Sequence, residues 1–420
     1  MPPRPAPSLS PYRFIVGFGV VSLFMDIVYQ GALAVQGPLL ASLGASAVVV
    51  GVVSGLGEAT ALAGRVVTGP WADRTRRYWT FALLGYLATA VTVPLMGVAG
   101  SALAVAALVI LERLGKSIRT PSRDAMLASA AVRVGTGRGF ALHEVLDQIG
   151  AVIGPLAVSW VLAVTAHNYA PALGMLAVPG VIAIVLLLFL RHRVPNPAGF
   201  ENAPAAAGPA ASAAPAASAP PSSLRQAPGF WQYLLFTFLT TSGLATFGVL
   251  SFHMVRGAGF TDAQVPALYA VAMAVDAGAA VLAGLAYDRF HLRALFLLPA
   301  LAVVLPVLAF DDDAARVIAG VMLWAVITGI QESTMRAAVA DVAPAGARAG
   351  AFGYFAITLG IGALVGGVMA GWLSQRSVPG LIAYTAVVQA AALAVLVVLD
   401  RRLSATRPRP RAARGPDAPN

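Results

Sequence analysis

The chain has 420 residues, of which 58% are hydrophobic and 11% charged, and its formal net charge is +10. A soluble protein of this size would be roughly 45–50% apolar and about 25% charged, so the composition excludes an ordinary soluble fold. The absence of cysteine excludes disulfides, thiolate metal sites and cysteine nucleophiles. Apolar stretches of about 20 residues, long enough to cross a bilayer, recur along the whole sequence. The composition therefore predicts an all-α polytopic membrane protein.

Charges, glycines and prolines divide the sequence into twelve apolar segments. We expect the first to remain a helix rather than a cleaved signal peptide, because Asp26 interrupts its apolar run. The transmembrane helices predicted in the first half cover 14–34, 47–68, 79–99, 102–120, 139–163 and 171–190. Those predicted in the second half cover 231–253, 264–284, 293–310, 315–335, 349–373 and 380–399.

The composition also predicts the domain organisation. We expect a six-helix bundle over 1–191, a disordered cytoplasmic linker over 192–229, a second six-helix bundle over 230–400 and a disordered basic tail over 401–420. The linker is rich in alanine, proline and serine and the tail in arginine and proline. Neither segment can bury enough apolar surface to fold.

The basic residues predict the orientation. If both termini lie in the cytoplasm, the external loops hold three of the 28 basic residues, Arg256, Arg316 and Arg376. This is the positive-inside asymmetry of a multi-pass protein. The basic segments would then face anionic lipid headgroups, which explains the net charge without nucleic acid. Only one of the 28 basic residues is lysine, and the others are arginine. This bias is typical of a GC-rich genome, so we expect a bacterial inner membrane protein.

The two halves of the sequence resemble each other. The matching blocks are 69–77 with 284–292 (offset 215), 119–124 with 336–341 (offset 217) and 139–155 with 351–367 (offset 212). Parallel repeats of this kind place a substrate site at their interface, near the middle of the membrane. We therefore expect two pseudo-symmetric six-helix bundles with a site between them.

With this repeat the chain resembles the major facilitator superfamily. The signature that follows the second span is matched by "GPWADRTRR", with Gly69, Asp73, Arg74 and Arg77, and its second copy keeps Asp288 and Arg289. The arginine of the fourth span is matched by Arg113. The resemblance implies the major facilitator fold, transport by alternating access, and a cytoplasmic gate at the signature loops.

The segment "GAVIGP" is similar to the antiporter signature of the superfamily, with Gly150, Gly154 and Pro155 in the matching positions. This similarity implies export by antiport, although Val158 and Ser159 replace a trailing glycine pair. The resemblance also implies that helices 2 and 11, and helices 5 and 8, meet across the halves. We expect their small residues, including Gly362 and Gly366 of helix 11, to allow close packing there.

Six ionisable residues crowd the stretch "LERLGKSIRTPSRD" at 111–124. On a helix, Glu112, Lys116, Arg119 and Arg123 form one stripe, which must face the bundle interior or water because unpaired charges in lipid oppose insertion. Arg113 is the candidate substrate-facing cation, or else a structural partner of Glu112. The residues predicted to latch onto Arg74 and Arg77 are Arg119, Arg123 and Asp124, with lipid-headgroup binding as the alternative.

Further ionisable residues interrupt other apolar helices and are candidate transport or proton-coupling sites. Asp26 lies beside Tyr29 and Gln30, and Glu58 lies two turns from Arg65, which could neutralise it. His143 and Asp147 share a helix face, as a proton relay or a packing network. The remaining expectations are that Asp276 is a protonated acid or a ligand contact and that Glu332 and Arg336 form a structural pair.

These features predict a secondary active transporter of a small organic solute, coupled to protons, with export by antiport favoured. The alternatives are proton-coupled uptake of an anionic metabolite, suggested by Arg65, Arg113 and Lys116, and a non-transporting membrane sensor. We expect a monomer that binds its solute, protons and membrane lipids. No enzymatic cluster, nucleotide motif or paired-histidine spacing is evident, so we expect no enzyme activity, cofactor or metal.

Overall fold

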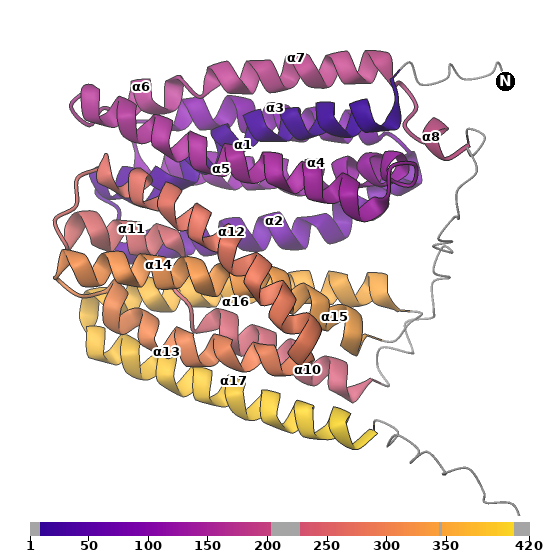
Figure 1. The fold of residues 1–420 in the computed structure, drawn as a ribbon. Coiled ribbons are helices and arrows are strands. Elements are labelled where there is room, and N and C mark those ends of the chain that lie inside the picture. The colour runs from indigo at the N-terminus through magenta and orange to yellow at the C-terminus, as the bar shows by residue number, and fades with distance from the viewer. Residues whose placement is uncertain (1–8, 203–226, 344–346, 407–420) are drawn as a thin grey trace, which may run out of the picture.

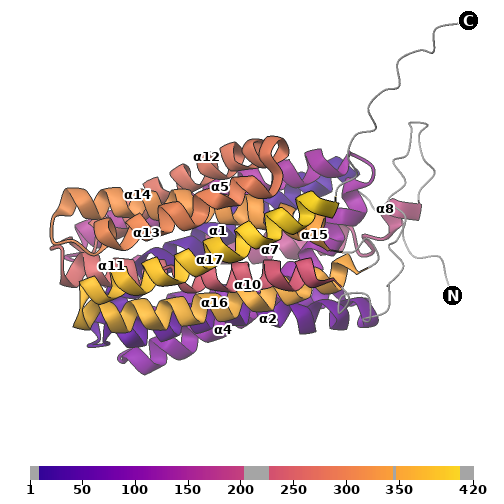
Figure 2. The ribbon, with the colours of Figure 1, turned by 90° about the horizontal axis from the view of Figure 1, so that it is seen from below.

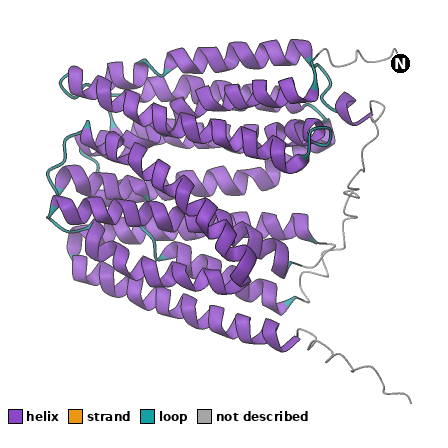
Figure 3. Ribbon diagram, viewed as in Figure 1, coloured by secondary structure: helices purple, strands orange, loops and turns teal. Residues whose placement is uncertain are grey.

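The structure, a computed structural model, describes residues 9–202, 227–343 and 347–406. All regular secondary structure in these residues is helical (Figure 3). The helices of the first half are α1 (Pro11–Ser42), α2 (Ala47–Thr75), α3 (Tyr78–Met96), α4 (Ala102–Ala131), α5 (Thr136–Val164), α6 (Tyr169–Gly174), α7 (Ala177–Arg193) and α8 (Gly199–Asn202).

The second half begins with α10 (Pro228–Ser242) and α11 (Phe247–Arg256), which share one membrane crossing. The elements that follow are α12 (Gln264–Phe290), the 3₁₀ helix η1 (His291–Phe296), α13 (Leu297–Ala309), α14 (Ala314–Ile330), the π-helix η2 (Gln331–Met335), α15 (Arg336–Val342), α16 (Arg348–Arg376) and α17 (Val378–Thr406). The π-helix continues α14 directly into α15, so these three elements form one crossing.

Ten segments of the described chain are long and apolar enough to span a membrane. One of them, Gln264–Ala309, contains both α12 and α13. The helix α4 has the necessary length, but it carries too many charges to qualify by composition. Counting α12 and α13 separately and adding α4 gives twelve crossings, so the predicted all-α twelve-helix fold is confirmed.

The helices pack as two lobes (Figure 1). The first lobe, α1–α7, and the second lobe, α10–α17, each contain a large apolar core. A third cluster, which includes Ala34, Ala151 and Phe247, joins the lobes. We call the end of the molecule where α1 begins and α17 ends the terminal face, and the end with the loops 43–46, 257–263 and 310–313 the loop face (Figures 1 and 2).

Side-chain caps define where several helices begin. Ser46 and Ser101 start α2 and α4 at the loop face, where their hydroxyls accept hydrogen bonds from the amides of Val49 and Ala104. Asp313 caps α14 in the same way. Such caps satisfy amide groups that the first turn of a helix leaves without partners.

Part of the predicted linker and tail is helical. α7 continues to Arg193, and the indole of Trp79 donates a hydrogen bond to the carbonyl of Val194. Phe200 is buried, with its ring 5.3 Å from that of Phe14. α17 continues to Thr406. The remaining parts of both predictions, 203–226 and 407–420, lie outside the described residues.

The internal repeat is visible in the packing of four glycines. Gly150 and Gly154 pack against the backbone of α1 at Leu23 and Ile27. At the predicted offset of 212, Gly362 and Gly366 pack against α10 at Phe238 and Thr241 and against the turn that follows it at Leu244. The expectation that these glycines pack between the halves is therefore wrong, because each pair allows close approach to a helix of its own lobe.

Other small residues do join the lobes, where α2 and α16 pack in antiparallel directions. A Cβ atom on Gly360 would lie 2.8 Å from the Cα atom of Ala59, and one on Gly367 would lie 2.5 Å from the carbonyl oxygen of Gly51. We call these contacts the α2–α16 seam. They leave no room for a side chain at Gly367, so the two backbones touch.

The lobes are also joined at the loop face. Gly37 of α1 packs against Gly248 and Ser251 of α11. Arg256 donates a hydrogen bond to the carbonyl of Ala41, and the hydroxyl of Ser159 donates one to the carbonyl of Ala263 at 2.6 Å. These contacts close the loop face in this conformation.

Candidate transport site

A cavity of about 320 Å³ lies between the lobes. Its walls come from α1, α2, α4 and α5 of the first lobe and from seven helical elements of the second. The phenol of Tyr269 donates a hydrogen bond to Gln30 at 2.9 Å and joins the two walls. The polar and aromatic lining residues are Tyr29, Gln30, Ser54, Glu58, Arg113, Lys116, Gln148, Thr241, Thr246, Phe247, Tyr269, Asp276, Trp324, Thr328, Gln331, Glu332, Arg336 and Phe355.

Arg113 is the central cation of the first-lobe wall. Its Nη1 atom lies 3.3 Å from Oε1 of Glu58, and its Nε atom lies 3.6 Å from Oε2 of Glu112. The guanidinium carbon lies 4.7 Å from the centre of the Tyr29 ring. Arg113 therefore lines the cavity and forms ion pairs at the same time. Glu58 pairs with Arg113 rather than with Arg65, so the alternative that Arg65 neutralises Glu58 is not realised in this structure.

The stripe predicted on α4 turns inward. Lys116 lies over the same tyrosine, with Nζ 3.8 Å from the ring centre. Arg119 is buried, donates a hydrogen bond to Thr89 and lies 5.1 Å from the ring of Tyr86. Thr89 in turn donates to Glu112 at 3.3 Å. Arg119 is thus held inside the first lobe rather than at the terminal face.

Arg123, Asp147 and His143 form a second charged network, deeper toward the terminal face. Arg123 lies 2.9 Å from Asp124 and 3.6 Å from Asp147. Nδ1 of His143 lies 3.6 Å from Asp147, and its Nε2 atom is hydrogen-bonded to Ser22 at 2.8 Å. The predicted shared face of His143 and Asp147 is therefore present, and a third helix adds Ser22.

The signature loop is separate from these networks. Asp73 accepts a hydrogen bond from Tyr78 at 3.0 Å, and Gly69 packs near Pro121. In the part of the chain that the structure describes, no ion pair joins Arg74 or Arg77 to α4, so the expected latch is absent in this conformation. The second copy of the signature lies at the same face, where Asp288 precedes Arg289, whose guanidinium stacks on Phe290.

Asp26 lies near the middle of α1 but outside the cavity lining. Its Cβ atom lies next to Gly150 of α5. The carboxylate is within electrostatic range of Asp147, Lys116 and Arg119. Asp26 therefore interacts electrostatically both with the cations of the cavity wall and with Asp147. The half-buried Arg65 is within range of Asp124 and Glu58, although its Nε atom has no hydrogen-bond partner among the described residues.

The second-lobe wall is acidic and aromatic. Asp276 of α12 is buried, and its Oδ1 atom has no hydrogen-bond partner in the described structure. Glu332 and Arg336 are exposed to the cavity and do not form the expected pair. The π-helix η2 interrupts the regular α-helical spacing in this segment. The aromatic residues of this wall, Phe247, Tyr269 and Trp324, were not predicted. They come from three different helices, α11, α12 and α14, so no pattern within one helix indicates that they meet.

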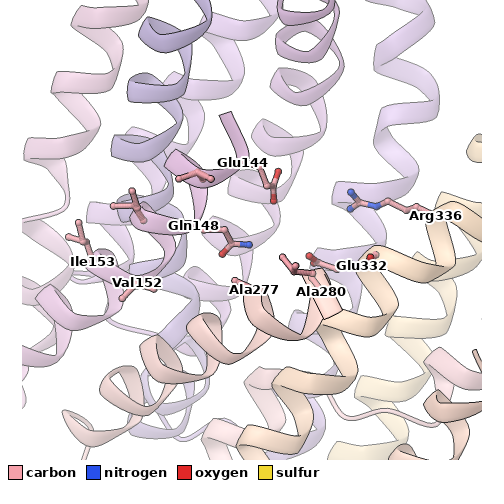
Figure 4. Close-up of a pocket in the computed structure, with 12 residues that line it drawn as sticks. Glu144, Gln148, Val152, Ile153, Ala277, Ala280, Glu332 and Arg336 are labelled. Atoms are coloured by element: carbon pink, nitrogen blue, oxygen red, sulfur yellow. The ribbon is translucent and has the colours of Figure 1, made fainter. Parts of the chain in front are cut away.

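A second opening of about 670 Å³ lies between α5 and α12 (Figure 4). Figure 4 shows Glu144 and Gln148 on the first-lobe side and Glu332 and Arg336 on the second-lobe side. Val145, Ile149, Ile153 and Val281 give it apolar walls. Gln148, Glu332 and Arg336 also line the central cavity, so the two spaces adjoin.

Comparison with known families assigns this architecture. The family profile described as Major Facilitator Superfamily matches residues 16–310. The chain belongs to the major facilitator superfamily. It is therefore a membrane transport protein rather than an enzyme, and the resemblance seen in the sequence is confirmed.

Relatives match this major facilitator protein over nearly its full length in one case and over about half of it in another. An uncharacterised protein of Mycobacterium tuberculosis is 47% identical over 394 residues, which cover 94% of each chain. An uncharacterised MFS-type transporter of Methanocaldococcus jannaschii is 27% identical over 190 residues, which cover 45% of this chain and 47% of that one.

Solved structures share the fold at low sequence identity. A POT family transporter in complex with 5-aminolevulinic acid aligns with a TM-score of 0.73 at 12% identity, covering 94% of this chain and 97% of that one. A bacterial homologue of the human lysosomal transporter Spinster, in an inward-facing occupied conformation, aligns with a TM-score of 0.69 at 15% identity, covering 96% and 100%. At these identities the likeness concerns the fold alone.

Proposed function

We propose that this major facilitator protein moves a small organic solute by alternating access, coupled to protons. The observation that carries this proposal is a charged cavity between two lobes that is closed at the loop face. A pathway that is closed on one side at a time is what alternating access requires. Because a single chain supplies every wall of the cavity, we propose that a monomer is sufficient.

We further propose that the terminal face lies in the cytoplasm of a bacterial cell. Arg74, Arg76 and Arg77 lie at this face, and basic residues favour the cytoplasmic side. The cavity would then open inward in this conformation. The antiporter-like segment around Gly150 supports export as the direction, with an inward proton gradient as the energy source.

The charged networks support proton coupling. Asp26 is within electrostatic range of Lys116 and Asp147, and Asp147 lies close to His143. A carboxyl group whose cationic neighbours move during the transport cycle can bind a proton in one state and release it in the other. These groups therefore offer a route from the terminal face to the cavity wall.

Proton coupling predicts that Asp26→Asn uncouples transport, because an amide cannot exchange the proton. In inverted vesicles that contain a pH-sensitive dye, a panel of solutes is tested for proton release that depends on the protein. For each solute that causes proton release with the natural protein, we expect the rate of this release to be at least about ten-fold lower in the variant. A loss of this size is expected when an essential proton-binding group is removed. Asp400→Asn, at an exposed ion pair with Arg293, serves as the control. Normal proton movement in Asp26→Asn would contradict this role.

Proton-coupled uptake of an anion is the second candidate. Lys116 lines the cavity and has no carboxylate within ion-pair distance among the described residues. It could therefore bind an anionic solute. Uptake predicts accumulation in right-side-out vesicles, whereas export predicts accumulation in inverted ones. A non-transporting sensor would move no solute in either orientation.

Alternating access predicts that a covalent link at the loop face stops transport. The natural chain has no cysteine, so Ser159→Cys together with Ala263→Cys introduces a single possible disulfide. The hydrogen bond from the Ser159 hydroxyl to the Ala263 carbonyl brings these two residues of opposite lobes close together at the loop face. We expect oxidation to abolish transport and reduction to restore it, with each single cysteine variant unaffected. Undiminished transport by the cross-linked protein would rule out opening of this face.

A further inference from the structure

The second-lobe wall contains a cluster of three aromatic rings. The Phe247 ring lies 4.3 Å from that of Tyr269 and 5.3 Å from that of Trp324, and the latter two lie 6.3 Å apart. All three side chains line the cavity. We call them the aromatic wall. Such a surface stacks against planar apolar groups and attracts cations to its ring faces.

Asp276 lies on the same helix as Tyr269, seven residues further along. Seven residues are about two helical turns, so the two side chains share a face at a separation of about 10 Å along the axis. Asp276 is 3% exposed, lines the cavity and has no cationic partner within ion-pair distance among the described residues. An isolated buried carboxylate is costly, so Asp276 is either protonated or paired with a cation, and the described residues supply no such cation within ion-pair distance.

The charges around Asp276 do not supply that partner. The charged groups that influence it are Glu332 and Glu144, which are both acids. On the opposite wall, Arg113 is held between Glu58 and Glu112. The charged cluster around α4 contains five bases and five acids, namely Arg65, Arg113, Lys116, Arg119 and Arg123 with Asp26, Glu58, Glu112, Asp124 and Asp147.

We propose that the cavity binds an organic cation with an aromatic or other planar apolar part. Its cationic group would pair with Asp276, and its apolar part would lie against the aromatic wall. This inference rests on the proposed transport function and names its substrate class. A cavity of about 320 Å³ accommodates a solute of drug-like size.

The test uses two probes of the same shape and opposite charge, tetraphenylphosphonium and tetraphenylborate. Binding of each to the purified full chain in detergent is measured by equilibrium dialysis. We expect the cation to bind at least ten-fold more tightly than the anion. Asp276→Asn should weaken cation binding at least ten-fold and leave anion binding unchanged. Trp324→Leu should also weaken cation binding. Asp341→Asn, which removes a carboxylate of the same lobe outside the cavity, is the matched control.

Asp276→Asn should fold normally, since no hydrogen bond or ion pair among the described residues is lost, and an unchanged thermal midpoint checks this. Tighter binding of tetraphenylborate by the natural protein would overturn the proposal. So would cation binding by folded Asp276→Asn at the natural affinity, or an equal loss in Asp341→Asn. If the protein binds the cation but moves no solute in vesicles, the proposed transport function is refuted and the proposed cation site is not. If it moves another solute but does not bind the cation, the proposed substrate class is refuted and the transport function is not.

Discussion

Replacement of Arg113 by alanine should lower the free energy of unfolding by about 3–5 kcal/mol and abolish transport, because it leaves the buried Glu112 and the cavity-facing Glu58 without their shared cation. Glu112 is buried and Glu58 faces the cavity, and both lie against the same guanidinium. Equilibrium unfolding in mixed detergent micelles measures the stability, and vesicle flux measures the transport.

Arg293→Ala is the matched control for this variant. Nε of Arg293 lies 3.5 Å from Asp400, a distance like those around Arg113, but the arginine side chain is 68% exposed. An exposed pair contributes about 0–1 kcal/mol, so we expect little loss. Arg113→Lys keeps the charge and should recover part of the stability. It lacks the branched guanidinium that contacts both Glu58 and Glu112, so the recovery should be incomplete. Equal losses in Arg113→Ala and Arg293→Ala would contradict the assignment of Arg113 as the central cation.

A single methyl group in the α2–α16 seam should also impair the protein. In Gly367→Ala the new Cβ atom would lie 2.5 Å from the carbonyl oxygen of Gly51. A backbone atom cannot rotate away, so the helices must separate at a cost of about 1–3 kcal/mol. If about 1.4 kcal/mol of this cost falls on the movement between the lobes, transport slows roughly ten-fold. Flux and thermal midpoint together measure the effect.

Gly278→Ala tests whether the effect belongs to the seam. Gly278 also lies in a transmembrane helix, α12, but a Cβ atom there would meet nothing within 4 Å. Because alanine favours a helix over glycine by about 1 kcal/mol, this variant should be as stable as the natural protein or more so. If both alanine variants behave alike, close backbone contact between α2 and α16 is not what matters.

Much of the fold could be predicted from the sequence. Hydrophobic length locates the crossings, because a bilayer sets a minimum span. The charged stripe on α4 predicts an inward-facing helix, and the structure buries Arg119 and pairs Arg113. The offset of 212 between the halves predicts equivalent positions, and Gly150 and Gly362 indeed pack against corresponding helices. These are regularities along the chain, and they can be recognised without knowing which helices are neighbours.

The candidate site was only partly predictable. The sequence identified Asp26, Glu58, Arg113 and Asp276 as charges at membrane depth, because an apolar background makes a charge conspicuous. It did not identify the aromatic wall, since single aromatic residues are ordinary in apolar helices. The expected Glu332–Arg336 pair assumed regular α-helical spacing, which the π-helix η2 interrupts.

The sequence by itself thus determined that the chain crosses the membrane repeatedly in two related halves and carries its charges inward. Only the tertiary structure decided which charged residues form ion pairs with each other. Glu58 pairs with an arginine of α4 rather than the arginine on its own helix, and Asp276 is left without a partner. The physical reason is that ion pairs and stacked rings depend on distances of a few ångströms between helices, which no spacing along one helix specifies.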